Sequence, residues 1–214
     1  MNCILLFHFI LLLISIVLLI FGISTPRWLV YINENTNGII SEYSHGIIEN
    51  CRRFYQHNND NATYNNIHIN DNAYICFNYL YKWHNTSRNG YDLPDYQKIL
   101  IGISFSCICI AVISLLLTQL INIKIPFYKI HFSKRIIDCL LITNILTAIL
   151  AMITLTLFFG FEHLQHILNC GYSFWLFVMG TCCIFVCCIL IAIFRIDVEF
   201  EFHRYYHESV ATLC

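Results

Sequence analysis

Four stretches of the chain are almost entirely apolar, and each is long enough to cross a lipid bilayer. They comprise residues 4–23, 99–121, 136–159 and 171–194. A helix rises 1.5 Å per residue, so about 20 apolar residues cover the roughly 30 Å of hydrocarbon in a bilayer. Lipid offers no partners to backbone N–H and C=O groups, so each stretch must satisfy its own as a helix. The sequence therefore predicts an all-α membrane fold, a four-helix transmembrane bundle.

The composition excludes an ordinary soluble domain and a nucleic-acid partner. Hydrophobic residues make up 58% of the chain and charged residues only 12%, whereas about 25% of residues are charged in a typical globular domain. The formal net charge of −1 gives no excess of positive charge that would attract a polyanion such as nucleic acid.

A cleaved signal peptide is the rival interpretation of residues 4–23. Met1-Asn2-Cys3 supplies no basic residue, and the sequence after Gly22 is a poor cleavage site, so a retained helix is favoured.

A polar segment, residues 27–98, separates the first two apolar stretches. Aromatic and β-branched runs within it are bounded by Asn, Gly and Ser, which is typical of short strands. These runs are residues 28–32, 39–43, 46–55 and 73–81. The Asn-rich residues 57–72 have the composition of a solvated insertion. We expect a small antiparallel β-sheet in this first loop.

The loop charges predict which side of the membrane each segment occupies. Residues 122–135 contain Lys124, Lys129, Lys134 and Arg135 and no acid, whereas residues 160–170 contain neither Lys nor Arg. Short cytoplasmic loops are rich in Lys and Arg. The expected layout is a single four-span domain, residues 1–214, with loops 24–98 and 160–170 outside. The loop 122–135 and the tail 195–214 are expected in the cytoplasm, as are both termini.

Two further features favour an extracellular first loop. Asn61-Ala62-Thr63 and Asn85-Thr86-Ser87 are N-glycosylation sequons, which are modified on the lumenal side. Of the twelve cysteines, Cys51 and Cys76 alone lie in the polar segment, and a disulfide between them would persist in an oxidising compartment. We therefore expect an integral membrane protein of the plasma membrane.

Specific residues of the first loop resemble a known superfamily. Trp28 follows the first span, Gly46-Ile47-Ile48-Glu49-Asn50-Cys51 is similar to a G-L-W-x-x-C motif, and Cys76 supplies a second cysteine. This layout resembles the claudin superfamily, which includes peripheral myelin proteins, epithelial membrane proteins and calcium-channel gamma subunits. Gly171-Tyr172-Ser173-Phe174-Trp175 resembles the entry to the last span in several of these groups and in the Clc-like branch.

The departures point to a divergent member of the superfamily. Ile47-Ile48 replaces the Leu-Trp of the motif, and the two cysteines lie further apart than in claudins. The resemblance implies a Cys51–Cys76 disulfide, which would close a loop of about 26 residues and contribute on the order of 3 kcal/mol; two free thiols are the alternative. Gly46 fits a turn or a close backbone approach. Trp28 fits either the lipid interface or packing against the sheet.

Several other polar residues have competing interpretations. The spacing of His163, His166 and Cys170 could bind zinc, but no fourth ligand is identifiable, and we expect no metal and no cofactor. Asp138 fits a carboxylate that pairs with the inner basic residues Lys134 and Arg135, rather than an intramembrane functional group. Asn144 fits a hydrogen bond between helices.

The remaining candidates concern modification and partners. Cys187 and Cys188 are candidates for palmitoylation or for close helix packing. Thr212-Leu213-Cys214 fits the C-terminal pattern that PDZ domains bind. No enzyme motif is present, such as G-x-S-x-G, H-E-x-x-H or a glycine-rich phosphate loop. We therefore expect no enzyme.

The resemblance implies protein–protein recognition through the disulfide-braced first loop, in cell–cell adhesion, junctions or membrane organisation. Phe159, Phe161 and Leu164 are candidates for an apolar patch in such contacts. The alternative is an auxiliary, gamma-like subunit that modulates an ion channel or receptor in the same membrane. The expected partners are the lipid bilayer and a membrane protein, either a second copy or another chain.

Overall fold

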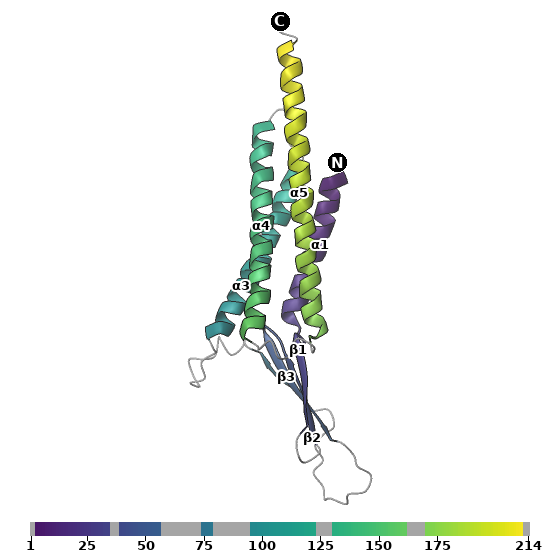
Figure 1. Cartoon of the computed structure of the whole chain (residues 1–214), viewed down its shortest axis with the longest axis vertical. Coiled ribbons are helices and arrows are strands. Elements are labelled where there is room, and N and C mark those ends of the chain that lie inside the picture. The colour runs from purple at the N-terminus through teal and green to yellow at the C-terminus, as the bar shows by residue number, and fades with distance from the viewer. Residues whose placement is uncertain are drawn as a thin grey trace, which may run out of the picture. The chain divides into compact units, whose positions relative to one another are not determined.

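The computed structural model describes residues 3–34, 39–56, 74–78, 95–122, 130–161 and 170–211. Four helices and one sheet make up this part of the chain (Figure 1). The helices are α1 (Cys3–Ser24), α3 (Asp95–Asn122), α4 (Ile130–Phe161) and α5 (Tyr172–Ala211). The strands are β1 (Leu29–Glu34), β2 (Ile39–His45), β3 (Glu49–Gln56) and β4 (Tyr74–Asn78).

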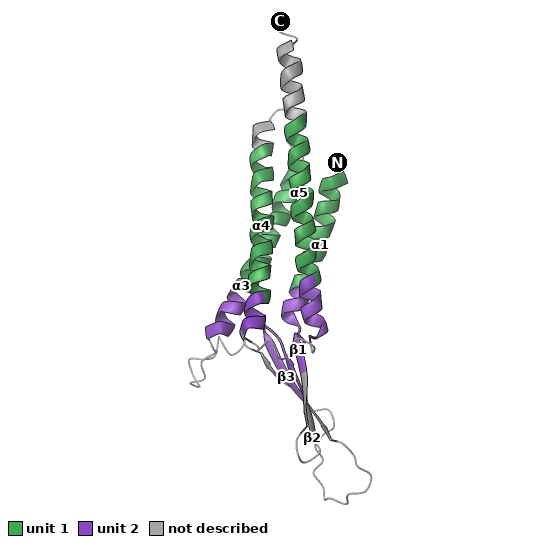
Figure 2. Ribbon diagram, in the orientation of Figure 1, with its two compact units in different colours: residues 1–19, 103–155, 179–214 green, residues 20–102, 156–178 purple. Residues whose placement is uncertain are grey.

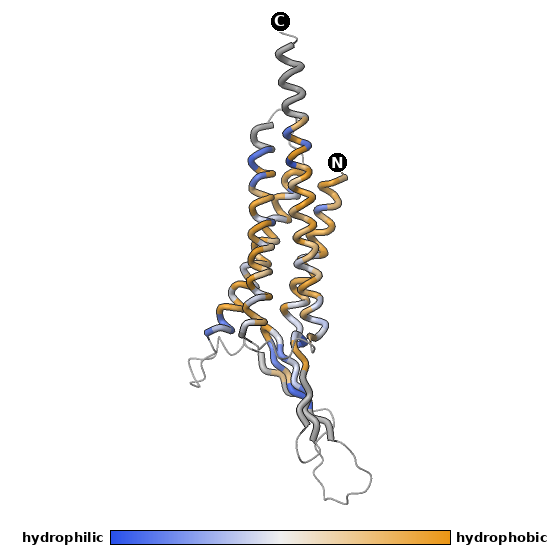
Figure 3. The backbone as a smooth tube through the Cα atoms, in the orientation of Figure 1, coloured by the Kyte–Doolittle hydropathy of each residue, from blue (hydrophilic) through white to orange (hydrophobic). Residues whose placement is uncertain are grey.

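All four helices are long and apolar enough to cross a membrane, which confirms the central prediction for the described residues. The apolar parts run over Cys3–Ser24, Asp95–Ile121, Lys134–Gly160 and Tyr172–Phe200. Hydrophobic residues dominate along these stretches (Figure 3). Large apolar side chains such as Phe7, Leu116 and Ile142 are exposed on the outer helix faces, as expected of surfaces that contact lipid.

The helices extend beyond the predicted apolar stretches. α5 continues to Ala211 through residues that were expected to form a tail, and α4 begins at Ile130 within the expected basic loop. α3 begins at Asp95, whose carboxylate pairs with Lys98 at 3.1 Å. Hydrocarbon thickness limits only the apolar part of a helix, and Lys, Arg and Glu are good helix formers in water. Hydropathy therefore located the helices but not their ends.

The sheet has four antiparallel strands in the order β1-β2-β3-β4. The prediction of a small antiparallel sheet is thus confirmed. In register, Tyr31 lies opposite Tyr43, Tyr43 opposite Arg52, and Cys51 opposite Cys76. Trp28 and Gly46 were expected inside strands, but they precede β1 and β3. Each instead makes a contact at the start of the sheet that is described below.

The chain divides into two compact units (Figure 2). Unit 1 consists of Met1–Leu19, Ile103–Leu155 and Met179–Cys214, and its core takes side chains from all four helices. One cluster of buried residues comprises Leu5, Ile137, Leu140, Ile191 and Phe194, with Leu117 and Ile121 packed against it. A second comprises Leu12, Ile16, Ala111 and Cys187. Helices that pack in lipid gain little from hydrophobic burial, so contacts within these clusters hold unit 1 by close packing.

Polar contacts join the helices of unit 1 at several levels. Ser15 Oγ of α1 donates to the Gly180 carbonyl of α5 over 2.7 Å. Asp138 of α4 pairs with Arg195 of α5 at 2.7 Å, and Lys134 pairs with Glu199 at 2.9 Å. The expected pairing of Asp138 with Lys134 or Arg135 is therefore wrong. Arg195 on the neighbouring helix reaches the carboxylate instead, and hydropathy alone could not show which helices are neighbours.

Leu12 and Leu13 provide a test of this packing, because they are adjacent on α1 and face opposite environments. Leu12 is 0% exposed, whereas Leu13 is 44% exposed. We expect Leu12→Ala to destabilise the protein by on the order of 2 kcal/mol, since it opens a cavity in the core. The matched control, Leu13→Ala, removes the same atoms from the outer face and should leave stability within about 0.5 kcal/mol. Thermal unfolding in lipid nanodiscs measures both, and equal losses would contradict this packing of α1.

Candidate functional site

Unit 2 consists of Ile20–Gly102 and Thr156–Val178, and Trp28 lies in its core. The Trp28 side chain is 0% exposed. Its ring lies 4.6 Å from that of Phe158, 5.1 Å from Phe177 and 5.9 Å from Phe174, between ring centroids. The indole N–H donates to the Gly22 carbonyl at the end of α1. The interpretation of Trp28 as a lipid-interface residue is therefore wrong, because a buried, hydrogen-bonded indole contacts protein on every side.

The two segments that carried the family resemblance contact each other. Gly171 N–H donates to the Trp28 carbonyl over 2.9 Å, and Ser173 N–H donates to the Arg27 carbonyl over 3.2 Å. Ser173 Oγ accepts from Arg27 N–H at 3.2 Å and from Thr25 Oγ1 at 2.6 Å. A Cβ at Gly171 would overlap the Arg27 carbonyl oxygen, so glycine is required there. These bonds join the start of α5 to the chain between α1 and β1.

Gly46 stands at the turn between β2 and β3. Its N–H donates to the Glu49 carbonyl over 3.0 Å. A Cβ at this position would lie 2.7 Å from the Pro26 Cα, so the close approach predicted for Gly46 is present. The turn residues Ile47 and Ile48 are 0% and 8% exposed, although hairpin turns are usually polar. Gln97 Nε2 of α3 donates to the Ile47 carbonyl over 2.8 Å, which attaches this apolar turn to a helix.

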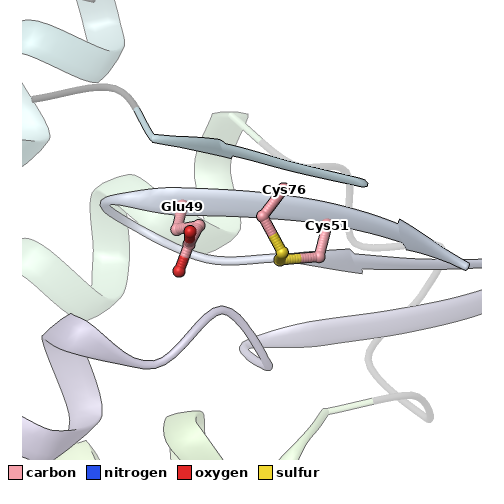
Figure 4. Close-up of side chains that lie close together, drawn as sticks. All are labelled: Glu49, Cys51 and Cys76. Atoms are coloured by element: carbon pink, nitrogen blue, oxygen red, sulfur yellow. A yellow bond between two sulfur atoms is a disulfide. The ribbon is translucent and has the colours of Figure 1, made fainter. Parts of the chain in front are cut away.

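Cys51 and Cys76 form a disulfide that joins β3 to β4 (Figure 4). Their Cα atoms are 4.1 Å apart at facing positions of the two strands. The Glu49 carboxylate lies near the two sulfurs, within 4.8 Å. Both sulfurs are bonded to each other, so neither is a thiolate available to a metal. The disulfide fixes β4 to the sheet, and β4 has no strand beyond it within the described residues.

Charged and aromatic side chains pair on the sheet. The Arg52 guanidinium lies 4.6 Å from the centre of the Tyr43 ring, directly across the β2–β3 pairing. On the other face of these strands, Ser44 and Cys51 are buried, at 4% and 3% exposed. Ser44 and Cys51 are paired across β2 and β3 and are both buried, whereas Arg52, which points to the opposite face, is exposed.

The structure describes only some of the remaining candidate residues. Asn61, Asn85, His163, His166, Phe161, Leu164 and Thr212–Cys214 lie outside the residues or side chains that the structure describes. Cys170 forms a β-bridge with Leu29, and burial raises the pKa of its thiol. The Cys187 side chain is buried in the bundle, where an acyl chain would displace a helix, whereas Cys188 is half-buried. Palmitoylation of these two cysteines stays a prediction.

Sequence reasoning missed several residues of this site. Phe158, Phe177 and Gln97 lie within or beside apolar stretches and carry no local signal of their contacts with Trp28 and Ile47. The expectation that Asn144 forms an interhelical hydrogen bond is confirmed, because its Nδ2 lies 3.1 Å from His8 Nε2. His8 did have a signal, since it is a polar residue in an otherwise apolar run.

No protein-family model and no curated protein sequence matches this chain. The resemblance to the claudin superfamily therefore rests on the layout of the spans and on the motif residues.

We expect the Trp28→Phe substitution to destabilise unit 2 more than the same substitution at Trp175. Phenylalanine retains most of the ring packing but loses the N–H that donates to the Gly22 carbonyl. A buried acceptor left without its donor costs about 1–3 kcal/mol. Trp175 is 58% exposed, so Trp175→Phe is the matched control and should change stability little. Thermal unfolding of both variants tests this prediction. Equal unfolding midpoints for the two variants would contradict the anchoring role of the Trp28 indole.

The disulfide gives a second stability prediction. We expect the double variant Cys51→Ala, Cys76→Ala to lose on the order of 3 kcal/mol, because the unfolded chain regains the freedom that the closed loop removes. Cys170→Ala removes a free thiol of the same unit and serves as the control. Electrophoresis without reductant should show a mobility difference between wild type and the double variant that disappears on reduction. Identical mobility would contradict the bond.

Proposed function

We propose that the chain is an integral membrane protein of the claudin-like type, which acts by protein–protein recognition in cell adhesion or membrane organisation. The observation that supports this most directly is the way the sheet is anchored. Trp28 hydrogen-bonds to the end of α1 and packs against Phe158 and Phe177, and Cys51–Cys76 closes the outer pair of strands. A sheet held in this way is a rigid base for recognition, which reduces the entropy lost on binding.

The described side chains favour recognition over chemistry. On the sheet, Arg52 takes part in a cation–π contact with Tyr43, and Glu49 lies beside the disulfide. Catalysis needs a nucleophile or an acid–base pair in mutual hydrogen-bond reach. The 2.6 Å hydrogen bond between Thr25 and Ser173 in unit 2 joins two structural elements. The face of β2 and β3 that carries Tyr43 and Arg52 is therefore the proposed recognition surface.

A cell-clustering assay tests the proposal that the protein acts in cell–cell adhesion. We expect non-adherent cells that express the protein at their surface to cluster, and cells that express the Cys51→Ala, Cys76→Ala variant to cluster at most half as much. Cys182→Ala, which removes an exposed cysteine of α5, is the control and should cluster normally. Surface labelling must show equal amounts of each protein. Wild-type cells that stay single at equal surface expression would exclude adhesion.

The alternative is a lateral partner in the same membrane, such as a channel to which the chain is an auxiliary subunit. The sequons at Asn61 and Asn85 favour it, because bulky glycans would hinder the close approach of two membranes. Crosslinking of intact cells followed by identification of the bound protein distinguishes the two. A reproducible channel or receptor partner supports the lateral role, whereas crosslinks between copies on adjacent cells support adhesion.

A further inference from the structure

His8 is buried in unit 1, at a level where all four helices contribute atoms around it. Its side chain is 0% exposed, as are those of Ser114, Thr118 and Asn144. His8 Nε2 lies 3.1 Å from Asn144 Nδ2 of α4, and His8 Nδ1 lies 3.4 Å from Thr118 Oγ1 of α3. Cys187 Sγ of α5 lies 3.9 Å from the His8 carbonyl oxygen. We call His8, Thr118 and Asn144 the His8 cluster.

The donors and acceptors of the His8 cluster fix the tautomer of the neutral imidazole. Asn144 Nδ2 can only donate, so His8 Nε2 accepts and carries no proton. The single proton of neutral His8 is then on Nδ1, and it points to Thr118 Oγ1. Thr118 in turn donates its hydroxyl proton to the Ser114 carbonyl over 2.9 Å. The chain of hydrogen bonds thus runs in one direction, from Asn144 through His8 and Thr118 to the backbone of α3.

One acceptor is left over in this arrangement. Asn144 Oδ1 is buried and has no hydrogen-bond partner among the described residues. An unpaired buried acceptor is costly, and a buried polar group of this kind requires an explanation. The orphan oxygen belongs to the same carboxamide that faces His8 Nε2. Rotation of this group by half a turn about its Cβ–Cγ bond would exchange Nδ2 for Oδ1 at the imidazole.

We propose that His8 and Asn144 form a proton-binding site inside the membrane-spanning bundle. A proton from water bonds to the lone pair of His8 Nε2, and no electron or leaving group is transferred. The Asn144 carboxamide rotates so that Oδ1 accepts the new Nε2–H bond, while Nδ1–H still donates to Thr118. Both N–H groups of the imidazolium then have an acceptor. Oδ1, which was unpaired, accepts from Nε2–H, and Nδ2 moves to the place that Oδ1 occupied.

Because the residues around His8 are neutral, the stability of the His8 imidazolium depends on the hydrogen bond that Asn144 accepts. The side chains that contact His8 are neutral: Thr118 on α3, Asn144 on α4 and the Cys187 thiol on α5. The carboxylate of Asp138 lies on α4 about two turns from Asn144 and pairs with Arg195 at 2.7 Å. Hydrogen bonds rather than a counter-ion must therefore stabilise the imidazolium. His8 lies roughly 8 Å along the helix axis from the start of α1, a short path for a proton from water.

Nitrogen NMR of the full chain in lipid nanodiscs, with ¹⁵N-labelled histidine rings, tests the proposal. The His8→Gln variant identifies the His8 signals by their loss. At neutral pH we expect a protonated Nδ1 and an unprotonated Nε2, and on acidification a form with both nitrogens protonated. In Asn144→Leu the doubly protonated form should need at least about tenfold more acid, because the acceptor for Nε2–H is absent.

Thr147→Val is the matched control, since Thr147 is a buried polar residue of α4 whose hydroxyl donates to the Thr143 carbonyl and not to His8. It should titrate like wild type. If Asn144→Leu does not fold, Asn144→Asp replaces it, and its carboxylate should make protonation of His8 about tenfold easier. An Nε2–H tautomer at neutral pH would overturn the proposal. So would a ring that stays neutral at pH 4, or a titration that neither Asn144 variant changes.

Discussion

Lipid is as apolar as the side chains of the four helices, so burial alone cannot hold these helices together. Close packing and a few well-placed polar contacts must do so instead. The structure has both. Leu12, Ile16, Ala111 and Cys187 pack in one cluster, and Ser15 donates to the Gly180 carbonyl. This bond gives the Ser15 hydroxyl an acceptor in a medium without water, and it specifies that α1 faces α5 at this level.

Close packing and polar contacts also attach the sheet to the ends of the helices. Four short strands with one outward face cannot build a core of their own. Unit 2 supplies one from helix ends, with Trp28 surrounded by Phe158, Phe174 and Phe177 and the Ile47-Ile48 turn buried beside Gln97. Backbone bonds from Gly171 and Ser173 connect the start of α5 to the segment before β1. The disulfide then secures β4, the strand furthest from β1 in the sheet.

The apolar character of Ile47 and Ile48 is easier to understand in this setting. The turn is buried, at 0% and 8% exposed, so its requirement is for apolar side chains of suitable volume rather than for an indole. The aromatic core of unit 2 is formed by Trp28 with Phe158, Phe174 and Phe177.

The sequence by itself determined the helices and strands, because these depend on local composition and on the spacing of apolar residues. Runs of apolar residues specify spanning helices because the backbone must satisfy its own hydrogen bonds in lipid. Alternating aromatic and β-branched runs specified the strands. The two polar-segment cysteines were expected to pair, and they do. The importance of Gly46, Gly171 and Trp28 was visible in the sequence, although their neighbours were not.

Only the tertiary structure decided which of these residues meet. Trp28 and Gly171 are far apart in the chain, and nothing local to either indicates the other. Asp138 pairs with Arg195 rather than with the basic residues close to it in sequence. His8 reaches Asn144 and Thr118 on two other helices. Interhelical contacts depend on the rotation and depth of each helix, and these are set by packing against all the others. Hydropathy, which averages over every face of a helix, does not contain that information.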